Sequence, residues 1–234
     1  MKRAIILAGG KGTRLRPFTI AFPKPLMPIG DQPILAVIIQ QLAMQGFEWV
    51  TLAVNHQAEL LKAFFGDGSR WNIKIDYSLE HEPLGTMGPL RLIDALPEHV
   101  LVMNGDILSD INYGKLLDAH ARENRLFTIA TAAREQCIDY GVLEIEEGHI
   151  SGFQEKPVIP YSVSMGVNCL SARALEFVPP ARPFGFDQLV LSLLECGERI
   201  TAFRHDGYWL DIGRPDDYQK AIEDWPKLKE SLQL

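Results

Sequence analysis

A glycine-rich stretch near the start of the chain, residues 7–19, has the composition of a phosphate-binding loop. Its glycines are Gly9, Gly10 and Gly12. Glycine lets the backbone approach a ligand closely and adopt positive φ angles, so that backbone amides can point at a bound anion. Residues 1–30 hold six Lys or Arg and no Asp or Glu, although the whole chain carries a formal net charge of −7. Positive charge is therefore concentrated where the glycines lie, which favours a ligand with several phosphates.

Two cations in this stretch have a distinctive spacing. Arg14 follows the glycines and Lys11, and Lys24 comes ten residues after Arg14, between Pro23 and Pro25. Each proline fixes its own φ and restricts the residue before it, so we expect Pro23-Lys24-Pro25 to be extended and stiff. A glycine turn with solvated cations would account for the loop, but not for a lysine held rigidly beside it.

The two commonest nucleotide-binding motifs are absent from the loop. Leu15 stands where the dinucleotide fingerprint requires its third glycine or alanine, and the Walker A spacing does not occur. A dinucleotide-dependent oxidoreductase is therefore disfavoured. The loop alone does not identify its ligand, so we next consider the strands and helices that position it.

Short apolar runs alternate with helical patterns over the first hundred residues. The runs that predict buried strands lie at residues 4–7, 49–54 and 100–103, and an alternation of apolar and polar residues at 73–77 predicts a less buried strand. The helical patterns lie at 34–43, 59–65 and 86–96. This β-α-β-α order predicts a Rossmann-like α/β fold with a doubly wound, mostly parallel sheet. Such sheets bind ligands outside the carboxyl ends of their strands. Asn104-Gly105-Asp106 follow the last of these strands, so Asp106 should face the same crevice as the glycine loop and is a candidate metal ligand.

The second half of the chain has a less regular pattern. Helices are predicted at residues 113–124, 172–177 and 187–196, and strands at 128–130, 140–145, 149–153 and 200–204. The two strands on either side of Gly148 should pair as a small antiparallel part, so the sheet becomes mixed there. An amphipathic segment begins at Pro215 and is predicted to form a docking helix. We find no internal repeat or linker and expect a single domain over residues 1–234.

The overall composition is that of a globular protein. Apolar residues make up 47% of the chain and charged residues 23%, which is enough for one large core or two joined cores. The net negative charge argues against nucleic acid and against an anionic membrane as the main partner. Three cysteines without a C-x-x-C pair indicate neither a disulfide framework nor a zinc site. The apolar run at residues 4–8 is too short for a signal peptide, so we expect a cytoplasmic protein with no membrane partner.

Motifs along nearly the whole chain resemble those of one family. Residues 7–15, with Pro17, Thr19 and 23–26, are similar to the signature of the sugar-1-phosphate nucleotidyltransferases, also called NDP-sugar pyrophosphorylases. Further similar segments follow in the family's order at Leu84-Gly85-Thr86, Gly88, Asn104-Gly105-Asp106, Tyr140-Gly141, 153–157, Met165-Gly166 and 209–213. The resemblance extends from about residue 3 to residue 220. Molybdenum-cofactor guanylyltransferases share a glycine loop with a following Arg and Lys, but their two cations lie closer together than Arg14 and Lys24 do.

The resemblance implies a reaction in which a nucleoside triphosphate (NTP) and a sugar 1-phosphate form an NDP-sugar and pyrophosphate, with Mg²⁺ as cofactor. The attacking phosphate oxygen is largely dianionic at neutral pH if its second pKa is about 6, so no general base is needed. The difficulty is to bring several negative groups together, which calls for cations. By the family pattern, the catalytic residues are Arg14, which neutralises the leaving pyrophosphate, and Lys24, which contacts the α-phosphate. Asp106 and Asp211 would share the metal ion.

The resemblance also implies two sets of binding residues. Those for the nucleotide are Leu7, Ala8, Gly9, Gly10, Gly12, Thr13, Glu82, Gly85, Thr86 and Gly88, and those for the sugar phosphate are Asn104, Gly141, Glu155, Lys156 and Gly166. Glu155 would accept hydrogen bonds from sugar hydroxyls, and Lys156 would bind the sugar phosphate. Judged from the residues alone, Asp106 could equally cap a turn, Asp211 could equally be a surface acid near a helix, and Glu155-Lys156 could be a solvated ion pair.

The same pattern divides one nucleotidyltransferase domain into three parts. The nucleotide-binding part would span about residues 1–110, the sugar-binding part about 111–214, and a closing helix about 215–230. The closing helix could also contact another subunit, so a homo-oligomer is compatible with the sequence.

The segment from Glu80 to Pro89 should select the base. Residues 84–89 resemble the LGTAG-type segment of mannose-1-phosphate guanylyltransferases and lack the glutamine motif of thymidylyl enzymes, which favours GTP. The sugar contacts are less typical, because Ser164-Met165-Gly166 replaces the commoner Asn-Ala-Gly and Asn168 stands where tyrosine is frequent. Mannose 1-phosphate and a manno-heptose 1-phosphate are the favoured sugars, ahead of glucose 1-phosphate.

Other functions stay open at this point. A thymidylyl-, uridylyl- or cytidylyltransferase acting on glucose 1-phosphate or a related sugar phosphate would use the same kind of site. A noncatalytic paralogue that binds nucleotide sugars as a regulatory subunit would be expected to lose one of the four charged residues named above. Arg14, Lys24, Asp106 and Asp211 are all present.

Overall fold

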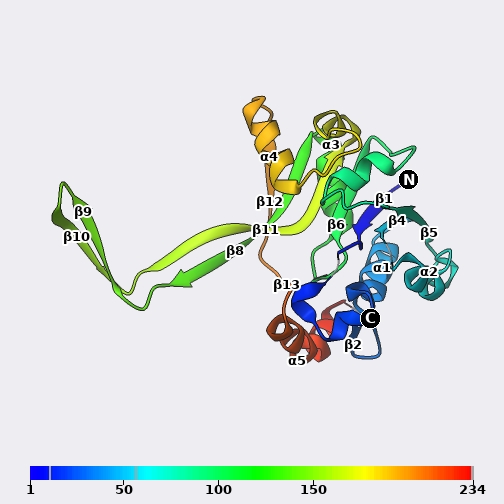
Figure 1. Cartoon of the computed structure of the whole chain (residues 1–234), viewed down its shortest axis with the longest axis horizontal. Helices are drawn as coiled ribbons and strands as arrows, with labels where there is room; N and C mark the ends of the chain where they lie inside the picture. The colour runs from blue at the N-terminus through cyan, green and yellow to red at the C-terminus, as the bar shows by residue number, and fades with distance from the viewer. Residues whose placement is uncertain (11, 56, 233–234) are drawn as a thin grey trace.

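The computed structural model describes residues 1–10, 12–55 and 57–232, which form an α/β fold around a seven-stranded sheet (Figure 1). The strands lie side by side in the order β12-β8-β11-β6-β1-β4-β5. Their bounds are β1 (Arg3–Leu7), β4 (Trp49–Val54), β5 (Lys74–Leu79), β6 (His99–Asn104), β8 (Phe127–Cys137), β11 (Val158–Ser171) and β12 (Ile200–His205).

The centre of the sheet is parallel and buried. β1 pairs in parallel with β4 and with β6, and β4 pairs in parallel with β5. Ala4, Ile5 and Ile6 are completely buried, as expected for a strand covered on both faces. β1, β4 and β6 confirm the three apolar runs that the sequence predicts as buried strands.

Helices cover both faces of the sheet. α1 (Ile34–Met44), α2 (Ala58–Phe65), α3 (Tyr113–Arg122) and α5 (Pro215–Leu232) contribute to one hydrophobic cluster, whereas α4 (Phe186–Glu195) and the 3₁₀ helices η5 (Gly88–Leu92) and η6 (Ala172–Phe177) contribute to another. Ala4 and Ile6 belong to the first cluster, and Ile5 between them belongs to the second. The sheet is therefore doubly wound, as predicted. None of the described helices is long and apolar enough to cross a membrane.

The segments predicted as helices at residues 86–96 and 172–177 are short 3₁₀ helices. η5 contains Pro89 at its start and covers only part of the predicted range. η5 stops before the extended residue Ile93, and Ala95 has a φ of 50°. η6 ends at Phe177, and the backbone of the following residue, Val178, is extended. Proline pushes the preceding residue out of the helical region, so Pro179 accounts for the end of η6.

The antiparallel part of the sheet contains a long arm. β8 has 11 residues and β11 has 14, whereas the sequence predicts only a short strand at residues 128–130. The inner halves of these strands also pair with β12 and β6, but among the described residues the outer halves pair only with each other. They carry the hairpin of β9 (Gly141–Glu146) and β10 (His149–Glu155), which confirms the predicted antiparallel pair. Residues 133–162, which we call the arm, extend far from the body of the molecule (Figure 1).

The last part of the chain returns to its beginning. β13 (Trp209–Asp211) pairs antiparallel with β7 (Ile107–Ser109). α5 then packs against the short hairpin of β2 (Pro28–Ile29) and β3 (Gln32–Pro33), where the Tyr218 hydroxyl donates a hydrogen bond to the Pro28 carbonyl at 2.7 Å. Trp225 is buried against Gly30, which leaves no room for a side chain at that turn. The predicted docking helix therefore docks on its own chain.

Candidate active site

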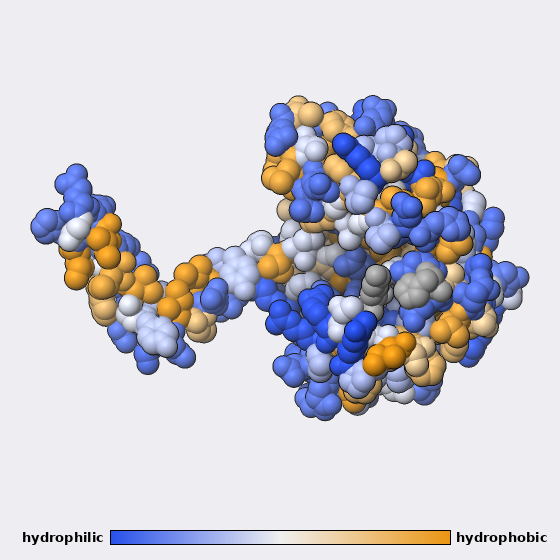
Figure 2. Space-filling view, in the orientation of Figure 1, coloured by the Kyte–Doolittle hydropathy of each residue, from blue (hydrophilic) through white to orange (hydrophobic). Residues whose placement is uncertain are grey.

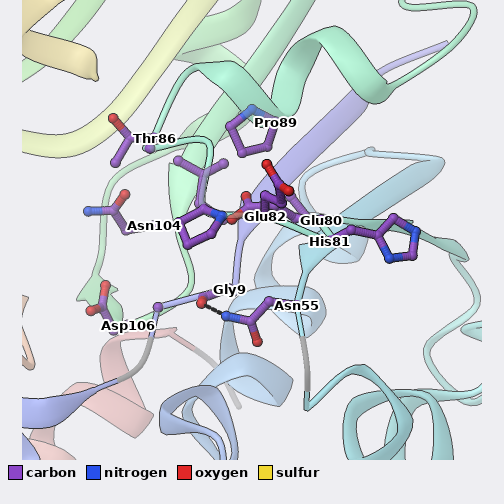
Figure 3. Close-up of a pocket in the computed structure, with 14 residues that line it drawn as sticks. Gly9, Asn55, Glu80, His81, Glu82, Thr86, Pro89, Asn104 and Asp106 are labelled. Carbon is purple, nitrogen blue, oxygen red and sulfur yellow. Dashed lines mark hydrogen bonds between the residues drawn. The ribbon is translucent and has the colours of Figure 1, made fainter. Parts of the chain in front are cut away.

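A cavity of about 650 Å³ opens at the carboxyl ends of the parallel strands (Figure 3). It is lined by Leu7 and Asn104, which end β1 and β6, and by Asn55 and Glu80, which follow β4 and β5. The other lining residues are Gly9, Gly10, Ala53, His81, Glu82, Pro83, Gly85, Thr86, Pro89 and Asp106. The cavity therefore lies where doubly wound sheets bind their ligands.

The glycine loop after β1 forms one wall of this cavity. The Asn55 side chain donates a hydrogen bond to the Gly9 carbonyl, which ties the loop to the end of β4 (Figure 3). Gly12 has a φ of 59°, and a Cβ atom there would lie 3.0 Å from the Cγ2 atom of Thr19. The Thr19 hydroxyl donates to the Gly12 carbonyl at 2.7 Å, so this turn requires glycine. Lys11, another cation of the loop, lies outside the described residues.

Lys24 and Asp106 form an ion pair beside the loop. The Nζ atom of Lys24 donates to Oδ2 of Asp106, and the two side chains are only 11% and 19% exposed. The other carboxylate oxygen, Oδ1 of Asp106, is buried and has no hydrogen-bond partner among the described residues. A buried acceptor without a partner is costly, so this oxygen is a suitable point for a cation or a ligand donor.

The backbone around Lys24 is only partly extended. Pro23 is extended, as predicted, but Lys24 begins a 3₁₀ turn, η3 (Lys24–Leu26). The turn is closed by a hydrogen bond from the Leu26 amide to the Pro23 carbonyl at 2.9 Å. The prolines therefore hold the lysine in a tight turn rather than in an extended segment.

Asp211 is brought beside Asp106 by the pairing of β13 with β7. The Ile212 amide donates to the Asp106 carbonyl at 3.0 Å. Burial raises the pKa of the Asp211 carboxyl and the charge of Asp106 raises it further, whereas the cations Lys24 and Arg14 act in the opposite direction. Two carboxylates that disfavour each other's ionised form can both be stabilised by a cation placed between them.

Arg14 lies against the same segment. A Cβ atom on Gly213 would lie 3.4 Å from Nη2 of Arg14, so the guanidinium group covers this glycine. Arg14 belongs to the 3₁₀ turn η1 (Thr13–Leu15), which is anchored by the completely buried side chain of Leu15. Two cations and two carboxylates from distant parts of the chain thus meet beside the cavity. Such a cluster can bind a polyphosphate together with a divalent cation.

The segment after β5 forms another wall of the cavity. Gly85 has a φ of 78°, and a Cβ atom there would lie 2.7 Å from the Phe184 carbonyl oxygen, so glycine is required. The Thr86 hydroxyl accepts a hydrogen bond from the Phe186 amide, at the start of α4, at 2.7 Å. Burial raises the pKa of the Glu80 carboxyl. This wall is therefore held firmly against the second hydrophobic cluster.

Asn104 and Gly166 lie together at the end of β6. Gly166 has a φ of 71°, and a Cβ atom there would lie 2.7 Å from Nδ2 of Asn104. The ring nitrogen of Trp209 donates to the Met165 carbonyl at 3.0 Å, which links this turn to β13. Two residues that the resemblance assigns to the sugar phosphate are therefore neighbours at the edge of the cavity.

The structure brings most of the predicted site residues to this cavity. Those that line it are Leu7, Gly9, Gly10, Glu82, Gly85, Thr86, Asn104 and Asp106. Those in the adjoining segments are Ala8, Gly12, Thr13, Arg14, Lys24, Gly88, Gly166 and Asp211. Gly141, Glu155 and Lys156 are not brought there, because they lie exposed on the arm (Figure 1).

Asn55 and Ala53 line the cavity although the sequence patterns do not single them out. Asn55 directly follows the predicted strand at residues 49–54, so the rule that residues after the strands face the crevice would identify it. Ala53 is an apolar residue inside a strand, and nothing in its local pattern distinguishes it from the core.

The chain is similar in sequence to proteins of one family over almost its whole length. Residues 3–227 match the family model described as nucleotidyl transferase. The mannose-1-phosphate guanyltransferase of Yarrowia lipolytica is 32% identical and the mannose-1-phosphate guanylyltransferase 1 of Arabidopsis thaliana is 34% identical, each over 92% of this chain. The chain spans 62% of the length of each of these relatives.

A solved structure with the same fold is that of HddC from Yersinia pseudotuberculosis. It superposes with a TM-score of 0.74 at 28% sequence identity and covers 96% of this chain and 100% of HddC. HddC complexed with GMP-PN superposes with a TM-score of 0.71. The match to the family model, with the glycine loop and charged cluster in place, shows that the chain belongs to the nucleotidyl transferase family.

Proposed function

We propose that the protein transfers a guanylyl group from GTP to mannose 1-phosphate or a manno-heptose 1-phosphate in the cytoplasm, giving a GDP-sugar and pyrophosphate. The observation that carries the proposal is the meeting of Arg14, Lys24, Asp106 and Asp211 beside a cavity walled by the glycine loop. The relatives named as mannose-1-phosphate guanylyltransferases and the complex of HddC with GMP-PN support guanine as the base.

The charged cluster suits an attack by one phosphate on another. A sugar 1-phosphate is largely dianionic near neutral pH, because the second pKa of a phosphate monoester is about 6, so the chain needs no general base. The glycine-loop amides would hold the triphosphate. Arg14 would neutralise the leaving pyrophosphate, and Lys24, oriented by Asp106, would act at the α-phosphate.

Asp106 and Asp211 would hold a divalent cation, which we propose to be Mg²⁺. The unpartnered Oδ1 atom of Asp106 and the adjacent carboxyl of Asp211 fit a hard cation. The described residues contain no group of three or more metal-ligating side chains, but Mg²⁺ needs only one or two carboxylates when phosphate oxygens and water complete its shell. When bound, the cation would neutralise charge on the phosphates.

The remaining proposed roles are the binding of the base and of the sugar phosphate. The segment from Glu80 to Pro89 would contact the base. Asn104 and Gly166 would contact the sugar phosphate at the cavity, and Gly141, Glu155 and Lys156, which lie on the arm, would contact it as well. In this proposal residues 1–110 bind the nucleotide, residues 111–214 bind the sugar, and the helix at 215–230 closes one domain.

A substrate matrix tests the proposal directly. GTP, ATP, CTP, UTP and dTTP are each combined with mannose, manno-heptose and glucose 1-phosphates, and pyrophosphate release is measured with Mg²⁺ and with EDTA. We expect release only when NTP, sugar phosphate and Mg²⁺ are all present, and most with GTP. Release with another base would select one of the other nucleotidyltransferases. No release in any combination, with tight binding of an NDP-sugar, would favour the noncatalytic paralogue.

A further inference from the structure

The arm holds three residues assigned to the site but lies away from the cavity. We propose that the arm of one chain reaches a second copy of this chain and places Glu155 and Lys156 in the sugar-phosphate half of that copy's active site. The inference rests on the proposed function, from which it takes the sugar-phosphate role of these two residues. If two chains exchange arms about a twofold axis, each arm completes the site of the other chain, and the dimer is a closed assembly with no unpaired arm.

The arm exposes more apolar side chains than expected for a segment surrounded only by water. All residues of the arm are described, and none of them is buried. Figure 2 shows apolar side chains gathered along it. Ile145 and Ile150 face each other across the hairpin and are 66% and 67% exposed, and Tyr140, Leu143 and Phe153 are also exposed. A two-stranded ribbon is marginally stable alone in water, and contiguous exposed apolar surface marks an interface.

The direction of the arm is set where it leaves the body. At the root of the arm, residues 133–137 of β8 pair continuously with residues 158–162 of β11, and the register of these two strands shifts only between Ser164 and Asn168, inside the body. The Arg134 guanidinium lies 4.6 Å from the centre of the Trp209 ring, at the root of the arm. The arm is thus an extension of the main sheet, held by the same segment that carries Asp211.

The end of β10 has a defined conformation that presents two charged side chains. Gly141 is covered by the Phe153 ring, since a Cβ atom there would lie 2.5 Å from that ring and 3.3 Å from the Glu155 carboxylate. Lys156 has a φ of 44°, which is uncommon for a residue other than glycine. Backbone conformations of this kind concentrate at functional sites, and here the turn leaves Glu155 and Lys156 exposed side by side.

In the part of the chain that the structure describes, the cations Arg14 and Lys24 lie beside the cavity but do not line it. Its described lining includes the carboxylates of Glu80, Glu82 and Asp106 and no Lys or Arg. Lys24 is already paired with Asp106. A sugar 1-phosphate adds a dianion to a site that also holds a triphosphate, so a further cation would stabilise the bound substrates. Lys156 of a second copy is such a cation, with Glu155 beside it to accept hydrogen bonds from sugar hydroxyls.

Charge favours docking of the arm on the glycine-loop side of another copy. Residues 133–162 contain six Asp or Glu and two Lys or Arg, whereas residues 1–30 contain six Lys or Arg and no acid. Complementary charge steers association and suppresses wrong partners. The acidic arm and the basic segment at residues 1–30 belong to the same chain, so a second copy carries the basic surface that complements the arm.

Mixed dimers of two inactive variants test whether the arm acts on the partner. Asp106→Asn disables the cation site but keeps the arm, and Lys156→Ala disables the arm but keeps the cation site. Each variant alone should be nearly inactive. When the two are co-expressed with different tags and purified as a mixed dimer, one site combines an intact cation site with an intact arm, and about half of the wild-type rate should return. No recovery would overturn the exchange of arms.

A reciprocal dimer distinguishes the partner's arm from the chain's own. The double variant, Asp106→Asn with Lys156→Ala, is paired with a wild-type chain. Exchange of arms predicts almost no activity, because the intact cation site receives the defective arm. An arm that folds back on its own chain predicts about half of the wild-type rate, which would refute the proposal. Wild-type homodimers must first release pyrophosphate, so an inactive wild type would instead count against the proposed function.

Oligomeric state gives a measurement that does not depend on activity. Light scattering after gel filtration should show a dimer, and Ile145→Asp with Ile150→Asp should shift it toward monomer with loss of activity. Leu191→Asp with Leu194→Asp, on the exposed face of α4, is the matched control and should stay dimeric. A fully active monomer would overturn the proposal.

Discussion

His120 makes the fold sensitive to mild acid. Its side chain on α3 is completely buried, Nδ1 is hydrogen-bonded to the Thr128 hydroxyl at 2.8 Å, and Nε2 has no partner among the described residues. Burial, together with the charges of the nearby His99 and Arg125, lowers the pKa of His120 from 6.5 to about 4. The folded protein therefore keeps this imidazole neutral at pH values where the unfolded chain has taken up a proton.

The size of the effect follows from this difference in pKa. Between pH 6.5 and pH 4 the unfolded state binds more protons than the folded state, so the free energy of unfolding falls as the pH is lowered. The contribution of His120 is fully present above pH 6.5, falls by about 2 kcal/mol between pH 7 and pH 5, and falls by about 3 kcal/mol by pH 4. Domains are usually stable by only about 5–15 kcal/mol, so this single residue should have a measurable effect.

Urea denaturation at pH 7, 6, 5 and 4, followed by far-UV circular dichroism, measures this loss. His120→Gln removes the titration but keeps an amide that can bond to the Thr128 hydroxyl. We expect the wild type to lose about 2 kcal/mol more than this variant between pH 7 and pH 5. His149→Gln, which is exposed on the arm, is the control and should follow the wild type. Equal losses in the wild type and His120→Gln would refute a buried neutral histidine.

The charged cluster and the glycines around it give three further expected outcomes. Asp106→Asn and Asp211→Asn should each lower the rate of pyrophosphate release about 100-fold or more with unchanged circular dichroism, because they remove charge and not packing; a near-normal rate in either would exclude that residue from the cation site. EDTA should stop the reaction and excess Mg²⁺ should restore it; a rate unaffected by EDTA would contradict a metal requirement. Gly85→Ala should destabilise the fold by about 1–3 kcal/mol in urea, since a Cβ atom meets the Phe184 carbonyl. Gly10→Ala, which has open space, is the control, and equal stabilities would contradict the strain at Gly85.

The buried elements of the fold could be predicted because their patterns are local. A strand covered on both faces is a continuous apolar run, and the runs that form β1, β4 and β6 stand out against their neighbours. The arm could not be predicted in the same way. Its root, residues 133–137, is polar and exposed, so its sequence does not reveal that β8 continues outward from the body. Only the pairing with β11 extends the strand.

The site could be predicted where it depends on strand ends, and not where it depends on long-range pairing. Asp106 follows β6 directly, so its position is a consequence of topology. Asp211 reaches the cavity through the pairing of β13 with β7, which no local pattern encodes. The assignment of Asp211 therefore came only from the resemblance to a family. The place of Glu155 and Lys156 depends on the arm, and for that reason the sequence could not fix it.

The charged cluster draws on nearly the whole length of the chain, because β13 carries Asp211 back to the strand that follows Asp106. The ribosome releases the chain from its N-terminus, so the glycine loop, Lys24 and Asp106 emerge long before Asp211. A nascent chain can therefore expose a phosphate-binding loop while it still lacks one of the two carboxylates. Under the proposed mechanism, a nascent chain cannot consume nucleotide until Asp211 has emerged and β13 has paired with β7.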